Sequence, residues 1–165
     1  MSPDPSVNYL HARYKKFTAT YNVFDTAVPN RTGLDLVNFP SDIADLAGNR
    51  IPQAPTWVIS VGYDHVFDLG TAGTVTASAS TRLKSFYYTD LFNYRDTRQS
   101  AFTQSDASLT WKPENKQFSV QAYVQNIENY RPLVYAGYTA ANTDDIFNWQ
   151  FGAPRTYGVR LSANF

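Results

Sequence analysis

The sequence predicts an all-β fold, namely one segment of an antiparallel, up-and-down transmembrane β-barrel with about six strands. Six segments alternate between apolar and polar residues, which gives each predicted strand one apolar and one polar face. The connections between them are alternately long and short, which is the connection pattern of transmembrane β-barrels. The 165 residues contain no apolar run of about 18, so we expect no transmembrane helix.

The first five strands are expected at residues 7–15, 56–67, 74–84, 102–112 and 117–126. Each is close to the length that a tilted strand needs to cross a bilayer. In the first, we expect Leu10, Ala12 and Tyr14 on one face and Tyr9, His11 and Arg13 on the other.

The sixth strand is expected at residues 156–165, where the alternation is unbroken. Tyr157 and Leu161 lie on its apolar side, Arg160 lies on its polar side, and it ends on the aromatic residue Phe165. Soluble domains usually end in frayed, polar residues. The closing strand of an outer-membrane barrel instead keeps its apolar face in lipid down to the rim.

The connections predict which end of the sheet faces which side of a membrane. Residues 68–73 and 113–116 form tight turns, whereas residues 16–55, 85–101 and 128–154 form long loops. Long structureless loops are uncommon in compact soluble domains, so we expect extracellular loops and periplasmic turns. Within the first loop, residues 40–45 are a candidate for a short helix.

Six strands are fewer than the smallest single-chain barrels contain, and an open sheet edge is not tolerated in lipid. We therefore expect residues 1–165 to be the C-terminal part of a larger barrel, or one share of an oligomeric pore. The polar faces then point into a water-filled lumen, where a charge costs little. The charged residues expected there are Arg13, Arg82, Lys84 and Arg160.

The amino-acid composition argues against several classes of function. Fourteen Lys and Arg balance fourteen Asp and Glu, so we expect no nucleic-acid partner. There is no cysteine, which excludes disulfides, thiolate metal sites and cysteine nucleophiles. His11 and His65 belong to no catalytic or metal-binding motif. We therefore expect no enzyme activity, no catalytic residues, no cofactor and no metal site.

Aromatic residues make up 16% of the chain and gather in the long loops. Such rings stack on sugars or on the rings of iron chelators, and they also pack loops against each other; the sequence leaves both roles open. The candidates for ligand contact are Tyr87, Tyr88, Tyr94, Tyr135, Tyr138 and Trp149.

Three motifs occur in order over residues 46–165. They are Leu46-Ala-Gly-Asn-Arg-Ile-Pro-Gln-Ala-Pro55 before Trp57, then Val124-Gln-Asn-Ile-Glu-Asn-Tyr130 after a Tyr87-Tyr88 pair, and finally Gly152-Ala-Pro-Arg-Thr-Tyr-Gly-Val-Arg-Leu-Ser-Ala-Asn-Phe165. In combination they resemble the strand entries and closing strand of TonB-dependent outer-membrane receptors.

That resemblance implies a 22-stranded barrel of which this chain holds the last six strands, without the N-terminal plug domain. It also implies energised uptake of a scarce nutrient, such as siderophore-bound iron, cobalamin or an oligosaccharide. The implied partners are outer-membrane lipid, the rest of the barrel, the plug domain, TonB through the missing N-terminal part, and the nutrient. Two alternatives remain: a soluble β-sandwich that binds carbohydrate, and a small oligomeric outer-membrane pore.

Overall fold

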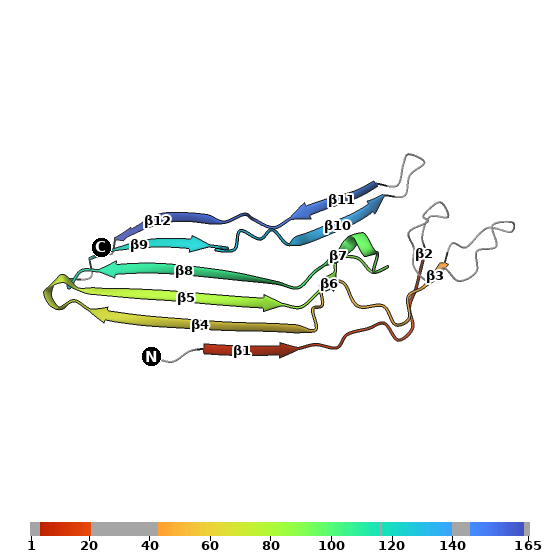
Figure 1. The fold of residues 1–165 in the computed structure, drawn as a ribbon, viewed down its shortest axis with the longest axis horizontal. Helices are drawn as coiled ribbons and strands as arrows, with labels where there is room; N and C mark the ends of the chain where they lie inside the picture. The colour runs from red at the N-terminus through yellow and green to blue at the C-terminus, as the bar shows by residue number, and fades with distance from the viewer. Residues whose placement is uncertain (1–3, 21–42, 116, 140–145, 164–165) are drawn as a thin grey trace.

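A computed structural model of the chain describes residues 4–20, 43–115, 117–139 and 146–163. Among these residues, six strands form one antiparallel sheet in the order β1-β4-β5-β8-β9-β12, and each strand lies beside its neighbour in an elongated layer (Figure 1). Their bounds are β1 Asp4–Tyr9, β4 Trp57–Asp68, β5 Thr74–Lys84, β8 Phe102–Lys112, β9 Phe118–Gln125 and β12 Thr156–Ala163. The all-β antiparallel fold predicted from the sequence is confirmed.

The register of the sheet carries the sequence alternation across the strands. In an antiparallel sheet, directly opposed residues share a face. Tyr63 on β4 opposes Ala79 on β5, which in turn opposes Ala107 on β8. Ser60, on the other side of the pleat, opposes Arg82 on β5. One face of the sheet is therefore apolar and the other is polar.

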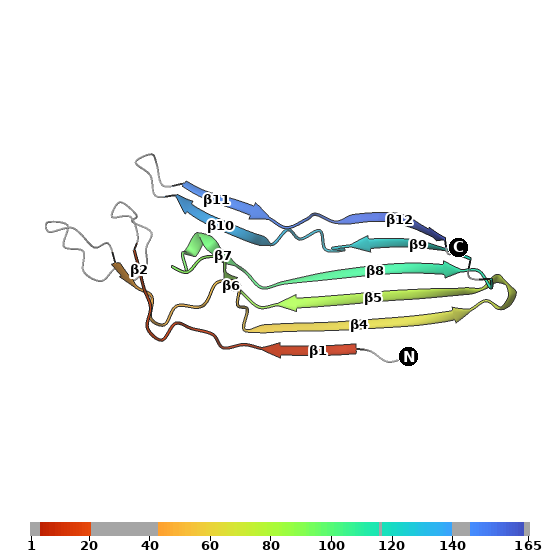
Figure 2. The same cartoon turned by 180° about the vertical axis from the view of Figure 1, so that it is seen from behind.

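The apolar face has no second layer over it in the described part of the chain. The side chains of Tyr157, Val159 and Leu161 are 81%, 68% and 75% exposed. The views from front and back both show a single sheet (Figures 1 and 2). A soluble sandwich would cover this face with a second sheet, and among the described residues no other sheet lies over it.

Three rings lie at the long-loop end of the apolar face, and three lie at the short-turn end. Tyr9 and Trp57 contact each other at the long-loop end, with ring centroids 4.6 Å apart, and Trp111 and Phe118 do so at the short-turn end at 5.5 Å. The third ring at the long-loop end is that of Tyr157, near the start of β12, and the third at the short-turn end is that of Phe67, near the end of β4. Paired belts of amphipathic rings are typical of membrane–water interfaces. Phe165, predicted to close the C-terminal strand, lies outside the described residues.

The strand bounds expected at 74–84 and 102–112 agree with β5 and β8, but the first strand differs. It was expected at 7–15, whereas β1 ends at Tyr9, because its partner strand β4 begins at Trp57. Tyr9 opposes Trp57 and so shares the apolar face; the expectation that Tyr9 joins the polar face is wrong. His11 and Arg13 follow the strand, outside the sheet.

The two tight turns lie at the end of the sheet where β1 begins and β12 ends (Figure 1). In the turn after β4, a 3-10 turn η1 (Gly70–Ala72) is followed by Gly73 with φ of 91°. Only glycine adopts such a backbone conformation without steric cost. The amide of Leu69 donates to the carbonyl of Gly73 at 2.9 Å, which closes the turn.

The long loops hold further structure at the opposite end. Among the described residues, three strand pairs form there, β2–β3, β6–β7 and β10–β11, together with the 3-10 turn η2. Their bounds are β2 Thr18–Thr20, β3 Ile43–Asp45, β6 Tyr87–Tyr88, η2 Arg95–Thr97, β7 Arg98–Gln99, β10 Leu133–Thr139 and β11 Ile146–Phe151. The helix expected at 40–45 is wrong over 43–45, where strand pairing with β2 prevails. No helix among the described residues is long and apolar enough to cross a membrane.

Gly158 on β12 leaves room for the ring of Tyr123 on the neighbouring strand β9, which it opposes. A Cβ atom on Gly158 would lie 2.8 Å from the Tyr123 hydroxyl oxygen and 3.1 Å from its Cζ. An aromatic ring laid over a glycine covers backbone that would otherwise be bare. The pair therefore fixes how β12 packs on β9.

We expect Gly158→Ala to destabilise the protein by about 1 kcal/mol, because the flexible Tyr123 ring must move aside. Gly62→Ala is the matched control, since Gly62 lies on the same polar face and a Cβ there meets nothing within 4 Å. The measurement is the free energy of unfolding by urea of the intact protein that carries this chain, in lipid vesicles. A larger loss for Gly62→Ala than for Gly158→Ala would contradict this packing role.

Candidate functional site

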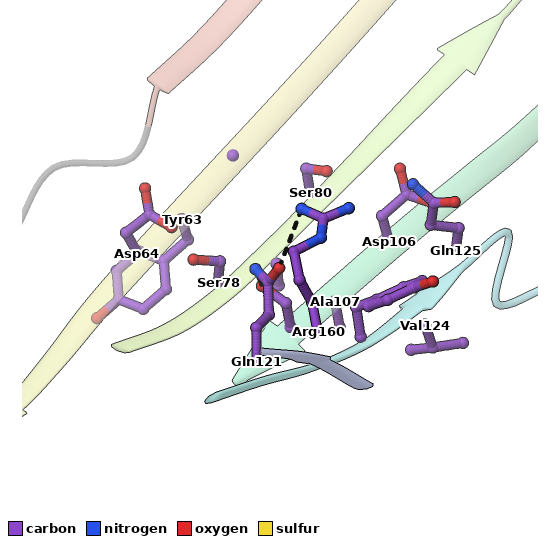
Figure 3. Close-up of a pocket in the computed structure, with 14 residues that line it drawn as sticks. Tyr63, Asp64, Ser78, Ser80, Asp106, Ala107, Gln121, Val124, Gln125 and Arg160 are labelled. Atoms are coloured by element: carbon purple, nitrogen blue, oxygen red, sulfur yellow. Dashed lines mark hydrogen bonds between the residues drawn. The ribbon is translucent and has the colours of Figure 1, made fainter. Parts of the chain in front are cut away.

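The polar face of the sheet holds a shallow depression of about 410 Å³. Its lining comes from five neighbouring strands of the main sheet, namely β4, β5, β8, β9 and β12 (Figure 3). At its centre Arg160 donates to the Oε1 atom of Gln121 at 3.5 Å, and its guanidinium lies 5.8 Å from the centroid of the Tyr123 ring. Hydroxyl and carboxylate groups surround this arginine; the labelled ones are Asp64, Ser78, Ser80 and Asp106.

Charge is distributed unevenly along this polar face. Asp64 and Asp106 line the depression, whereas Arg82 and Lys84 follow toward the long-loop end of β5. The Nε of Arg82 donates to the hydroxyl of Ser60 at 3.3 Å, and the Nζ of Lys84 lies 5.9 Å from the centroid of Phe102. The wall therefore carries charges of both signs in its middle and is basic toward the loops.

Of the four charged residues predicted to face a lumen, three lie on this wall: Arg82, Lys84 and Arg160. Arg13 does not, because it follows the end of β1. There its side chain donates to the carbonyl of Gly48, and its backbone pairs with that of Arg50 in an isolated antiparallel β-bridge. The six strands described enclose no lumen, so the lumen-facing role of all four stays a prediction.

The structure separates the predicted ligand-contacting aromatics into two groups. Tyr87 and Tyr94 are buried between the loops, with 8% and 3% exposure, so in this arrangement their rings pack loops and do not face solvent. Tyr135 and Trp149, on opposite faces of the β10–β11 hairpin, are 52% and 54% exposed. Tyr88 is half-buried, and the side chain of Tyr138 lies outside the described part.

Tyr87 ties two of the long loops together. Its hydroxyl donates to the carbonyl of Leu133 at 3.1 Å, and burial raises the pKa of this phenol, to which nearby Tyr130 adds. Gln99 makes a second connection, because its Nε2 donates to the Tyr130 hydroxyl at 2.8 Å and its Oε1 accepts from the Leu133 amide. The β6–β7 hairpin is thus fixed to the start of β10.

Asn126 organises the exit from β9, a role that sequence reasoning missed. Its Nδ2 donates to the carbonyls of Tyr130 and Ala153 at 2.9 and 3.0 Å, while its Oδ1 accepts from the Tyr130 amide at 3.1 Å. Its own amide donates to Asp106 on β8 at 2.8 Å. Its φ of 55° is a left-handed conformation that asparagine tolerates better than most residues. The available signal was asparagine at both 126 and 129 of the second motif.

The side chain of Glu128 binds β8 just beyond Ala107, where the pairing of β8 with β9 ends. The Ser105 amide donates to one of its carboxylate oxygens at 2.8 Å and the Ser105 hydroxyl donates to the other at 2.6 Å. A carboxylate that accepts two hydrogen bonds is stabilised in its charged form. The hydrogen bond from the Ser105 side chain is the main reason that the pKa of Glu128 lies below its usual value.

This contact predicts an acid-sensitive loop anchor. Because the folded pKa is depressed, the stabilisation is present above the ordinary glutamate pKa of about 4.3 and is lost as the pH falls through the folded value. We expect the Ser105 amide of the intact protein to exchange hydrogen faster, relative to its intrinsic rate, once the pH falls below about 4. Glu128→Gln should remove this pH step; an unchanged step in that variant would contradict the role.

Metal and catalytic chemistry find no support at this site. Within the described ranges, no three His, Asp or Glu side chains gather closely enough to hold a metal ion. The described residues thus form one open sheet with an apolar and a polar face, and smaller strand pairs lie at one of its ends.

The family model described as "TonB dependent receptor-like, beta-barrel" matches residues 7–127, most of the chain. The chain belongs to this family. TonB-dependent receptors are transporters and not enzymes, so the prediction that this protein is not an enzyme is confirmed. None of the curated proteins matches the sequence.

Among solved structures, the sheet is similar to the ferric yersiniabactin uptake receptor FyuA from Yersinia pestis, with a TM-score of 0.63 and 24% sequence identity. The match covers 78% of this chain and 19% of the FyuA chain. This TonB-dependent receptor chain therefore spans about a fifth of that relative, and the likeness supports the barrel fold alone.

Proposed function

We propose that this chain is the C-terminal part of the barrel of an outer-membrane TonB-dependent transporter, which takes up a scarce nutrient with energy supplied through TonB. The family membership supports this proposal. The candidate nutrient classes are siderophore-bound iron, cobalamin and oligosaccharides. Because FyuA is an uptake receptor for ferric yersiniabactin, iron chelates are the first class to test.

The observation that carries the proposal is the uncovered apolar face of a sheet that ends in two open edges. Among the described strands, β1 and β12 each have one neighbour only. In lipid, the outward amide and carbonyl groups of these edges must be paired by further strands. The rest of the barrel supplies these strands in this proposal, and a plug domain outside this chain fills the lumen and contacts TonB.

The same proposal orients the sheet in the membrane. The three loop hairpins face the outside, where they meet the nutrient, and the two tight turns face the periplasm. The exposed rings of Tyr135 and Trp149 are then available for ligand contact, whereas Tyr87 and Tyr94 hold the loops in place.

Uptake by cells tests the proposal. The gene that encodes this chain is deleted, and uptake of radiolabelled ferric chelates, cobalamin and an oligosaccharide panel is compared with that of the parent strain. We expect loss of uptake for one class, restoration by the gene, and abolition by a protonophore, because the energy reaches the receptor through TonB. Unchanged uptake of all classes would refute the transport function.

Fractionation of the same cells separates the alternatives. The proposal expects the protein in the outer membrane and, after extraction in detergent, a mass of one whole receptor. A soluble protein would favour the carbohydrate-binding sandwich, and an oligomer of short chains would favour the small pore.

A further inference from the structure

Two arginines share one aromatic ring at the loop end of the polar wall. The guanidinium carbons of Arg50 and Arg98 lie 4.2 and 4.6 Å from the centroid of the Phe86 ring. Both distances are within the range of cation–π contact. We call these three residues the Arg50–Phe86–Arg98 cluster.

The backbone around the cluster is held by contacts between two of the long loops and within the second of them. The Arg50 amide donates to the Oδ1 of Asn93 at 2.8 Å, and the Nδ2 of Asn93 donates back to the Arg50 carbonyl at 3.1 Å. Arg98 pairs with Tyr88 across the β6–β7 hairpin, and the Tyr88 ring meets Phe86 edge-on with centroids 6.3 Å apart. The two cations are therefore held on a scaffold that is in place before any ligand arrives.

The two positive charges lack acidic partners in the described part of the chain. Besides contacting the ring, the Arg50 guanidinium donates a hydrogen bond to the Thr56 hydroxyl at 2.8 Å. The side chain of Arg98 is exposed. Both distances to one ring place the charges within about 10 Å of each other, the screening length at 0.1 M salt. They repel each other, and an anion bound at the edge of the cluster, within reach of both, would relieve that repulsion.

The cluster also continues the basic part of the wall. Arg82 and Lys84 lie on β5, and Phe86 follows two residues after Lys84, the last residue of that strand. Pairing with β4 continues past Lys84, since the Ser85 amide donates to the Trp57 carbonyl at 2.9 Å. Alternation then puts all three side chains on the polar face. Four cationic side chains thus lead from the loop base down the wall.

We propose that the Arg50–Phe86–Arg98 cluster binds a carboxylate or phosphate group of the transported molecule, so that the receptor selects an anionic nutrient. The inference rests on the proposed uptake function and names the substrate class. An arginine stacked on a ring keeps the N–H groups at its edge free, and these donate in pairs to planar anionic oxygens. Arg82 and Lys84 extend the positive field further along the wall.

The test uses the intact protein that carries this chain, purified in detergent, and titrated calorimetrically at low ionic strength. The probes are citrate, inorganic phosphate and the uncharged ester triethyl citrate. We expect the receptor to bind citrate or phosphate and not the ester. The double variant Arg50→Gln/Arg98→Gln should weaken anion binding about tenfold or more, since each lost charged hydrogen bond is worth about one order of magnitude.

Two sets of variants distinguish binding from a role in folding. Arg50→Lys/Arg98→Lys should retain part of the affinity, because the charge remains while the paired donors are lost. Arg131→Gln is the matched control: Arg131 also lies over a phenylalanine, with 5.9 Å to the Phe151 centroid, but its Nε already donates to the Gly152 carbonyl. If the double variant does not fold, Arg98→Gln alone replaces it, because Arg98 is exposed.

No binding of either anion by the parent protein, or equal binding by the parent and by the Gln variant, would overturn the inference. These outcomes leave the proposed transport function untouched, because uptake is measured separately in cells. The converse result is also distinguishable. If citrate binding depends on Arg50 and Arg98 but deletion of the gene affects no uptake, the anion site is supported and the transport function is refuted.

Discussion

Asn126→Ala is expected to destabilise the intact protein by about 3 kcal/mol. The substitution removes three side-chain hydrogen bonds and leaves the Tyr130 amide and the Tyr130 and Ala153 carbonyls without these partners. It also puts a residue with no polar side chain into a left-handed conformation, since φ at this position is 55°. The measurement is the free energy of unfolding by urea in lipid vesicles.

Asn129→Ala is the matched control for Asn126→Ala. Asn129 has a similar φ of 54°, but it is exposed and its Oδ1 accepts one hydrogen bond, from the Arg155 amide. We expect its loss to be about 1 kcal/mol. Equal losses at both positions would show that backbone conformation alone matters and that the network of Asn126 does not.

Leu109→Arg is expected to lower the fraction of the protein that inserts into bilayers, because an arginine on the lipid face costs up to about 2–4 kcal/mol, the value at mid-membrane. Leu109 lies on the apolar face, opposite Ala77 and Ala122, and is 55% exposed. The measurement is the fraction of the intact protein that folds into lipid vesicles, seen as the shift in gel mobility on heating.

Thr110→Arg tests the opposite face at the same depth. Thr110 opposes Thr76 and Gln121 on the polar side of the sheet, where water meets the added charge in a barrel. We expect near-normal folding for this variant. If Thr110→Arg blocked insertion and Leu109→Arg did not, the assignment of lipid and lumen faces would be reversed.

The strands that the sequence predicted best are those bounded by strong turn signals. β5 follows the glycine turn that ends at Gly73, and β8 ends before Pro113; for both, the predicted bounds agree with the structure. β1 was predicted too long, because its local alternation continues through Arg13 although its pairing partner begins at Trp57. The end of a strand depends on its neighbour, and a single segment does not contain that information.

Prediction of the candidate site was less complete. The basic residues Arg82, Lys84 and Arg160 were placed on the polar face by alternation alone. The sequence left open whether rings such as those of Tyr87 and Tyr94 face a ligand or pack between loops, because the composition of an aromatic loop does not distinguish the two roles. The Arg50–Phe86–Arg98 cluster was also missed, since Arg50 comes from the first long loop whereas Phe86 and Arg98 come from the second.

The sequence by itself therefore determined the two faces of this receptor segment, because successive side chains on a strand point to opposite sides by covalent geometry. Tertiary structure alone decided how the loops meet. Tyr87 reaches Leu133 across 46 residues, and Gln53 reaches Val134 across 81. Such contacts join segments that are distant in the sequence and that the pairing of the main sheet brings together, so no local pattern encodes them.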